Sequence, residues 1–452
     1  MLPASRTMLQ ASTSRRVVAA ALSHIRSVST GAKDHYKILV VGAGSAGLSV
    51  ANQVYDRFKS EGKSLNKDDI AVVDAADYHY YQPGWTLVGA GLKPKTDFRR
   101  PLASLITPHV TLIPENVATF TPTASSVTTT EGRTLGYDTL VVATGLGINW
   151  DGIKGLSSAL ADPTSGVSSI YSYNTCDKVW DDIEGLRSGN AIFTQPAGVI
   201  KCAGAPQKIM WMAWDRFRKT GRGENVNVKF YTGMPTMFSV KKYSDALNKL
   251  RMERGIDGFF EHNLTAVDVA NHKAIFKKAD GSTVDVDYTT LHATPPMGPL
   301  KFIKDSPIAD KVGWVSVDQG TLQHTNPEFA NIFAIGDCSS LPTSKTAAAI
   351  TAQAPVLTEN LYSFINTGKV SDKARYDGYT SCPLLTAYGE LMLAEFKYGL
   401  EPKETFSAFL DQSKSRRLFY HLKKDVFPTA YWNYMVKGKW FGTKGLMRPS
   451  YK

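Results

Sequence analysis

The sequence predicts an α/β protein with two Rossmann-like, dinucleotide-binding domains in tandem and an amphipathic helical segment at the C-terminus. Two observations predict this fold. A glycine-rich turn joins an apolar strand to a helical pattern at residues 36–59. Two further apolar strands end in Ala143-Thr144-Gly145 and Gly336-Asp337. At 452 residues the chain is long enough for two or three domains.

The composition is that of a globular protein, with 43% hydrophobic and 21% charged residues. The net charge of +11 lies mainly at the two ends. Residues 1–30 hold four arginines and no acid, and residues 414–452 hold ten Lys or Arg and one acid. The body of the chain is therefore not basic, which argues against a nucleic-acid partner.

The first thirty residues are rich in Arg, Ser and Thr, a composition typical of a mitochondrial transit peptide, although a disordered tail shares it. No apolar run approaches the ~18 residues that a transmembrane helix needs. Four cysteines are too few for a disulfide scaffold, so a reducing compartment is expected. No cysteine belongs to a zinc pattern, and no metal is expected.

The first strand, residues 36–41, runs into the GxGxxG turn at residues 42–47. In this motif Gly42 allows the tight turn, Gly44 lets the backbone approach a pyrophosphate, and Gly47 permits close packing of helix and strand. A second strand ends in Asp74, the candidate acid for a ribose hydroxyl, although a solvated strand-end carboxylate would look alike.

The segment after Asp337 favours a small-residue helix over residues 341–354, introduced by Pro342 and Thr343. Its positive N-terminal end and Lys345 could stabilise an anionic ring system. A solvated first-turn lysine is an equal alternative for Lys345.

The second nucleotide position departs from the usual pattern. A strand at residues 190–194 is present, but no GxGxxG follows it. Pro196 and Pro206 remove backbone donors from the loop, and Cys202 stands where a pyridine nucleotide would bind. This absence argues against NADH as the reductant and for a small substrate that reacts with thiols.

Two of the four cysteines are candidates for chemistry. Lys201, Lys208 and the start of a helix at about residue 206 can lower the pKa of Cys202. Cys382 precedes Pro383, so its chain is extended or turned. Burial as a packing residue is the better interpretation for the other two cysteines, Cys176 and Cys338.

The strands ending in Thr144-Gly145 and Asp337, together with GxGxxG, resemble the two-dinucleotide-fold flavoproteins over residues 36–370. Four segments resemble the mitochondrial sulfide:quinone oxidoreductase family more specifically: Val199–Met210, Leu291–Met297, Ile335–Ala349 and Tyr376–Leu384. This second likeness extends from about Lys37 to the C-terminus.

The resemblance implies an FAD-dependent enzyme with a redox-active Cys202–Cys382 pair, joined as a disulfide or trisulfide. Such an enzyme oxidises hydrogen sulfide, passes two electrons through FAD to ubiquinone, and hands the sulfane sulfur to glutathione or sulfite. Some bacterial relatives in this family hold FAD covalently through a third cysteine that lies earlier in the chain. No cysteine precedes Cys176 here, so non-covalent FAD is expected. Together with the motif residues, the implied FAD contacts are Gly42, Gly44, Ser45, Ala46, Gly47, Asp74, Gln82, Val117, Thr144, Gly145, Asp337, Lys345, Ala347, Ala348, Ala349 and Ile350.

Residues 414–452, here called the tail, combine their ten cations with nine aromatic residues. Their pattern predicts two short helices, residues 416–425 and 429–436, broken at Pro428. Aromatic and cationic residues without a full span favour a monotopic anchor on the mitochondrial inner membrane, on the matrix side by resemblance. Two amphipathic helices packed on the flavin domain are the alternative.

The predicted division of the chain follows from these motifs. It comprises a transit peptide at 1–30, FAD-binding parts at 31–165 and 301–380, a second Rossmann-like domain at 166–300 and a C-terminal segment at 381–452. Two other functions stay open. A single-chain NADH:quinone dehydrogenase would need a second GxGxxG, and a non-catalytic flavin-binding interaction protein would need purely structural cysteines.

Overall fold

A computed structural model describes residues 34–451, and the expected transit peptide at residues 1–30 lies outside this range. Residues 35–452 form one unit of the chain. Within the described residues, no helix is both long enough and apolar enough to cross a membrane.

The first sheet supplies the glycine-rich turn. Its strands run in the order β5-β2-β1-β8-β7-β6, and β19 also pairs with β8. Strands β5, β2, β1, β8 and β19 are parallel. The apolar runs of β2, β19 and the ends of β1 and β8 are buried on both faces. The strands are β1 (His35–Val41), β2 (Ile70–Val73), β5 (Thr111–Ile113), β6 (Val117–Thr121), β7 (Ser126–Thr129), β8 (Thr134–Val142) and β19 (Ile332–Ala334).

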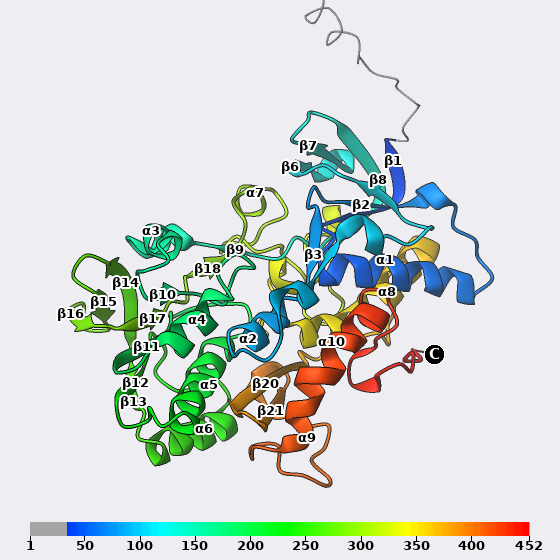
Figure 1. The fold of residues 1–452 in the computed structure, drawn as a ribbon. Helices are drawn as coiled ribbons and strands as arrows, with labels where there is room; N and C mark the ends of the chain where they lie inside the picture. The colour runs from blue at the N-terminus through cyan, green and yellow to red at the C-terminus, as the bar shows by residue number, and fades with distance from the viewer. Residues whose placement is uncertain (1–33, 452) are drawn as a thin grey trace, which may run out of the picture. The chain divides into compact units, whose positions relative to one another are not determined.

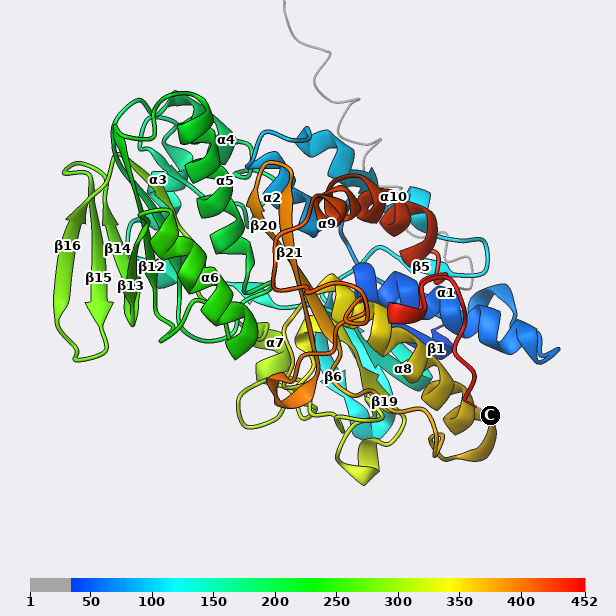
Figure 2. The same ribbon diagram turned by 90° about the horizontal axis from the view of Figure 1, so that it is seen from below.

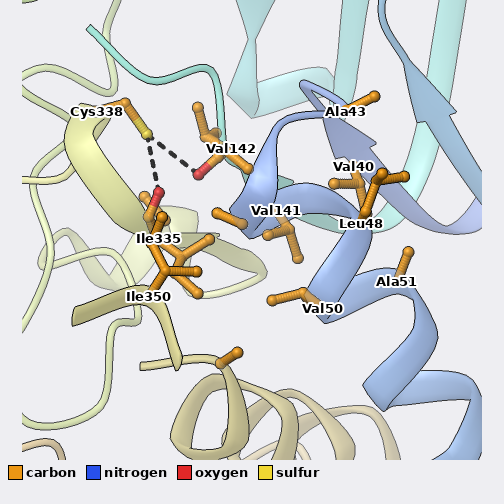
Figure 3. Packing of buried hydrophobic residues seen from close by; sticks show 14 of the residues in the cluster. Val40, Ala43, Leu48, Val50, Ala51, Val141, Val142, Ile335, Cys338 and Ile350 are labelled. Atoms are coloured by element: carbon orange, nitrogen blue, oxygen red, sulfur yellow. Dashed lines mark hydrogen bonds between the residues drawn. The ribbon is translucent and has the colours of Figure 1, made fainter. Parts of the chain in front are cut away.

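Helices α1 (Ser45–Ser60) and α8 (Ala347–Thr367) contact each other beside this sheet (Figure 1). Buried aliphatic side chains pack where α1 meets the sheet, among them Val40, Val141, Leu48 and Val50 (Figure 3). Cys338 closes this core: its thiol donates to the carbonyl oxygens of Val142 and Ile335 at 3.3 and 3.4 Å. Cys338 therefore packs, as expected.

The second sheet is parallel throughout, in the order β10-β17-β11-β12-β13. A three-stranded antiparallel sheet, β14-β15-β16, lies next to it in the chain. The strands are β10 (Val167–Ser168), β11 (Gly189–Gln195), β12 (Val226–Thr232), β13 (Asp257–Phe260), β14 (His262–Asp268), β15 (Lys273–Lys278), β16 (Thr283–Asp287) and β17 (Thr290–His292). The helices of this region are α3 (Leu156–Ala161), α4 (Lys178–Gly185), α5 (Ala205–Lys219) and α6 (Lys241–Glu253).

A hairpin carries the second candidate cysteine. Strands β20 (Thr380–Ala387) and β21 (Glu390–Phe396) pair antiparallel, and Figure 2 shows them between α5 and α9 (Arg417–His421), which they contact. The remaining short elements are β3 (Tyr78–Tyr80), α2 (Trp85–Val88), β4 (Arg99–Pro101), β9 (Gly147–Ile148), β18 (Met297–Gly298), α7 (Lys301–Lys304) and α10 (Phe427–Ala430).

The predicted break at Pro428 is wrong. The chain is helical from Arg417 through Met435, with wide π-helical turns at Leu422–Val426 and Tyr431–Met435 on either side of α10. Proline lacks an N–H group and clashes with the carbonyl four residues earlier. The wider turn before Pro428, in which the Phe427 N–H bonds to Leu422 O, lets the chain continue.

The predicted start of the helix after Asp337 is also wrong. Helix α8 begins at Ala347, where the Thr346 hydroxyl accepts a hydrogen bond from the Ala349 N–H at 3.0 Å. The preceding chain pairs instead with the Cys202 loop: Cys202 N–H donates to Lys345 O at 2.8 Å. This long-range bond holds residues 341–346 outside the helix.

Candidate active site

The glycine-rich turn between β1 and α1 has room for no side chain at two of its glycines. A Cβ on Gly47 would lie 1.8 Å from the Gly42 carbonyl oxygen. Gly42 has φ +102°, and a Cβ there would lie 2.6 Å from Ala143 O. A Cβ on Gly44 would meet no atom within 4 Å, and Gly44 lines a cavity. The turn therefore offers bare backbone and a helix N-terminus to a ligand, as a dinucleotide phosphate site requires.

That cavity has a volume of about 600 Å³, within the usual range for a cofactor site. Of the residues that the sequence assigns to FAD, most line it: Gly42, Gly44, Ser45, Ala46, Asp74, Gln82, Thr144, Gly145, Asp337, Lys345, Ala347, Ala348 and Ile350. Among the described residues, Gly47, Val117 and Ala349 lie outside this lining, and their assignment to FAD stays a prediction.

The carboxylate of Asp337 tests whether the lining of this cavity fits FAD. Its Oδ1 atom is shut off from solvent and has no hydrogen-bond partner among residues 34–451. Burial raises the pKa of this carboxyl, while Lys345 and Lys201 oppose the shift. A buried acceptor without a partner at the edge of a cavity suits a ligand with hydroxyl donors, and the ribityl chain of FAD supplies them.

Asp74 and Lys345 are held by the protein itself. Asp74 directly follows β2, and its two oxygens accept from the N–H groups of Ala43 and Ala76 at 2.7 and 2.9 Å. Lys345 is buried, donates to Ser339 O at 2.5 Å and lies over the Trp314 ring. The alternative of a solvated lysine is therefore excluded.

The two candidate cysteines meet in space although 180 residues separate them. Cys202 lies in the loop between β11 and α5 with φ +53°, and Cys382 lies in β20. Their sulfur atoms are 3.8 Å apart. Gly204 permits this approach, because a Cβ there would lie 2.6 Å from the Cys382 sulfur. Cys202 lines the cavity, whereas Cys382 is buried behind it.

The surroundings polarise the pair. The buried Lys208 ammonium donates to the Cys202 sulfur at 3.2 Å. A hydrogen bond from Cys382, with the charges of Lys208 and Lys423, holds the pKa of Cys202 well below its ordinary value. The same hydrogen bond, with burial, raises the pKa of Cys382. Cys202 is therefore the sulfur on which negative charge is stable.

Comparisons with known proteins show what the chain is similar to. Residues 36–187 match the family model described as pyridine nucleotide-disulphide oxidoreductase. The mitochondrial sulfide:quinone oxidoreductase of Schizosaccharomyces pombe is 52% identical over 93% of this chain and 94% of its own length. The Dictyostelium discoideum protein of the same name is 46% identical over 92% of this chain and 89% of its own.

The chain belongs to the sulfide:quinone oxidoreductase family. Among solved structures, the sulfide:quinone oxidoreductase of Aquifex aeolicus superposes with a TM-score of 0.70 at 18% identity, over 89% of this chain and 92% of that one. This likeness confirms the predicted tandem Rossmann-like α/β fold, and membership of the family confirms the resemblance read from the sequence.

For this sulfide:quinone oxidoreductase family member, sequence reasoning missed several cavity residues in or near the tail. Lys423 is only 3% exposed, donates to Pro83 O at 3.2 Å, and has a pKa lowered to about 7 by burial and by Lys208. Tyr431 is buried against the glycine-rich turn. The cations and aromatics of the tail carried no signal that these two side chains point inward.

Proposed function

We propose that this protein oxidises sulfide at the Cys202–Cys382 pair and reduces a quinone with the two electrons released. The observation that carries the proposal is the meeting of two distant cysteines, with a lysine on one sulfur, at the wall of a cavity suited to FAD. The names of the family's members, which state sulfide and quinone, support it.

The active form of the pair is an oxidised bridge. A direct disulfide needs the sulfurs to approach from 3.8 Å to about 2.05 Å, whereas one inserted sulfur spans a wider gap. HS⁻ attacks the Cys382 sulfur, and a new S–S bond forms as the bond to Cys202 breaks. Cys382 becomes a persulfide that keeps the proton of HS⁻, and Cys202 leaves as a thiolate with the bonding pair.

Lys208 stabilises this leaving thiolate, which faces the cavity. Non-covalent FAD, when bound, supplies a two-electron acceptor beside Cys202 and a donor to ubiquinone. Glutathione or sulfite removes the outer sulfur of the Cys382 persulfide and leaves a thiolate. The two cysteine thiolates would then close their bridge by giving up two electrons, for which FAD is the proposed acceptor.

The quinone is proposed to use the other face of the β20–β21 hairpin. Side chains alternate along a strand, so Ser381 and Pro383 point away from the face that carries Cys382. Both line the cavity. The tail adds the apolar side chains of Leu422, Val426 and Phe427 to the same lining. Strand β20 would thus lie between the Cys382 sulfur and the quinone, while Cys202 lines the same cavity as the quinone.

The tail is proposed to rest on a membrane surface, the inner mitochondrial membrane on its matrix side. Supporting this, Leu418, Val426 and Met447 are 56%, 47% and 71% exposed, and exposed cations accompany them at Lys437 and Lys439. Cosedimentation with cardiolipin-containing vesicles should fall sharply in the Leu418→Ser, Met447→Ser double variant, because both side chains lie outside the cavity lining. Equal binding of the variant contradicts this part of the proposal.

The proposal is tested by sulfide-dependent reduction of a short-chain ubiquinone analogue. Cys202→Ser and Cys382→Ser should each lower the rate by about a thousandfold or more, as loss of a reacting atom does. Cys176→Ala is the matched control, since Cys176 is buried away from the cavity and donates to Tyr173 O. Turnover with NADH that survives both serine variants contradicts the proposal and favours a dehydrogenase.

A further inference from the structure

The tail forms one wall of the proposed flavin cavity. Besides the apolar residues near the hairpin, Tyr431, Met435 and Trp440 line it, and they come from the helical run and the chain that follows. Figure 1 shows this C-terminal segment, in red, beside α1 and α8. The cavity is therefore complete only when the tail is packed against the rest of the protein.

Tyr431 joins this wall to the glycine-rich turn. Its side chain is 2% exposed, and its hydroxyl lies 2.7 Å from Ser45 Oγ and 2.5 Å from His79 Nε2. The other nitrogen of His79 lies 2.9 Å from Ala43 O. Burial lowers the pKa of His79, which keeps the ring neutral.

These contacts allow one consistent order of donors. Ser45 donates to the Tyr431 oxygen, Tyr431 donates to Nε2 of His79, and the protonated Nδ1 of His79 donates to Ala43 O. Ala43 and Ser45 flank Gly44 in the turn. The chain of hydrogen bonds therefore fixes both sides of the backbone that would carry the pyrophosphate.

A second set of bonds seats the same segment along α1. Ser49, Asn52 and Gln53 donate to the carbonyl oxygens of Met435, Val436 and Trp440 at 2.9, 2.9 and 3.1 Å. With Ser45 they occupy one face of the helix, at the spacing that stacks side chains along it. These hydrogen bonds hold the segment against α1, the helix whose N-terminus would bind the pyrophosphate.

We propose that Tyr431 is a positioning residue for FAD, and that docking of the tail on α1 and binding of FAD stabilise each other. This inference rests on the proposed flavin. Without the Tyr431 hydroxyl, Ser45 and His79 lose a buried partner and the turn loosens where the cofactor binds. Because coupling is reciprocal, bound FAD must also hold the segment in place.

The test compares Tyr431→Phe with Tyr434→Phe in the full-length holoenzyme in mild detergent. Tyr434 lies in the same helical run and is exposed. Release of FAD is followed by flavin fluorescence after dilution. We expect about tenfold faster release from Tyr431→Phe, the effect of leaving buried polar groups unpaired, and wild-type release from Tyr434→Phe.

A second readout is trypsin cleavage after Lys437 and Lys439 with and without FAD. FAD should slow cleavage in the wild type, and less so in Tyr431→Phe. If Tyr431→Phe does not fold, Ser49→Ala is the second variant: it removes a hydroxyl that lies outside the cavity lining and bonds to Met435 O of the segment and to Ser45 O of α1, and it should also speed FAD release.

The outcomes separate this inference from the proposed function. Wild-type protein that binds no flavin contradicts the flavin assignment itself. Flavin-loaded protein whose release rate is unchanged in both Tyr431→Phe and Ser49→Ala contradicts only the role of Tyr431. Equal loss of thermal stability in the apo and holo variant, with an unchanged FAD dissociation constant, would show a purely structural role and also overturn it.

Discussion

Gly204→Ala should disable the cysteine pair without altering any reacting atom. The backbone at Gly204 has φ −85°, which alanine adopts freely, so the effect is purely steric. The added Cβ would lie 2.6 Å from the Cys382 sulfur and 2.3 Å from Leu384 Cδ2. Ordinary contact begins at 3.4 Å, so the Cys382 sulfur and the Leu384 side chain must move by about 1 Å.

A misplacement of about 1 Å costs about a hundredfold in rate when reacting atoms must be aligned. Overpacking of this kind also lowers the free energy of unfolding by about 1–3 kcal/mol. The assay is sulfide-dependent quinone reduction, with mass spectrometry of the Cys382 persulfide. Gly185→Ala is the control, because a Cβ there meets no atom within 4 Å. Wild-type turnover and persulfide yield in Gly204→Ala would refute the geometry.

Three further predictions concern charged groups at the site. Lys208→Met should move the pH midpoint of Cys202 alkylation in the reduced protein upward by at least about one unit, because the ammonium 3.2 Å away is lost; an unmoved midpoint contradicts this. Lys423 has its pKa lowered from 10.5 to about 7, so its cost to stability is fully present below pH 7 and is relieved as the pH rises toward 10.5. Lys423→Met should therefore raise the melting temperature most at pH 6 and least at pH 10, and a pH-independent difference would contradict the burial of the charge. Asp337→Ala should weaken FAD binding by about tenfold or more in equilibrium dialysis, since it removes the acceptor that has no protein partner; unchanged affinity would exclude Asp337 from the cofactor site.

The glycine-rich turn was predictable because its glycines, strand and helix are local in the sequence and their spacing has one structural meaning. The meeting of Cys202 and Cys382 was not derivable from spacing. It came from the family resemblance, and the physical reason for it, the bare Cα of Gly204 beneath the Cys382 sulfur, appears only in three dimensions.

In the tail, the sequence predicted the composition of a surface but not which side chains are buried. Its cations and aromatics predicted a surface segment, yet Lys423 and Tyr431 are buried in the cavity wall. Composition does not tell which side of a helix faces the protein. The late start of α8 has a similar cause, since a hydrogen bond between Cys202 and Lys345 overrides the local helical preference.

In the proposed function, electrons enter the flavin through the cysteine pair. Anaerobic titration of the wild type, Cys202→Ser and Cys382→Ser with sulfide, followed by flavin absorbance, tests it most directly. Sulfide should bleach the wild-type flavin, a ubiquinone analogue should restore the oxidised spectrum, and both variants should stay oxidised. A wild-type flavin that sulfide leaves unchanged, or variants that bleach as fast as the wild type, would contradict it.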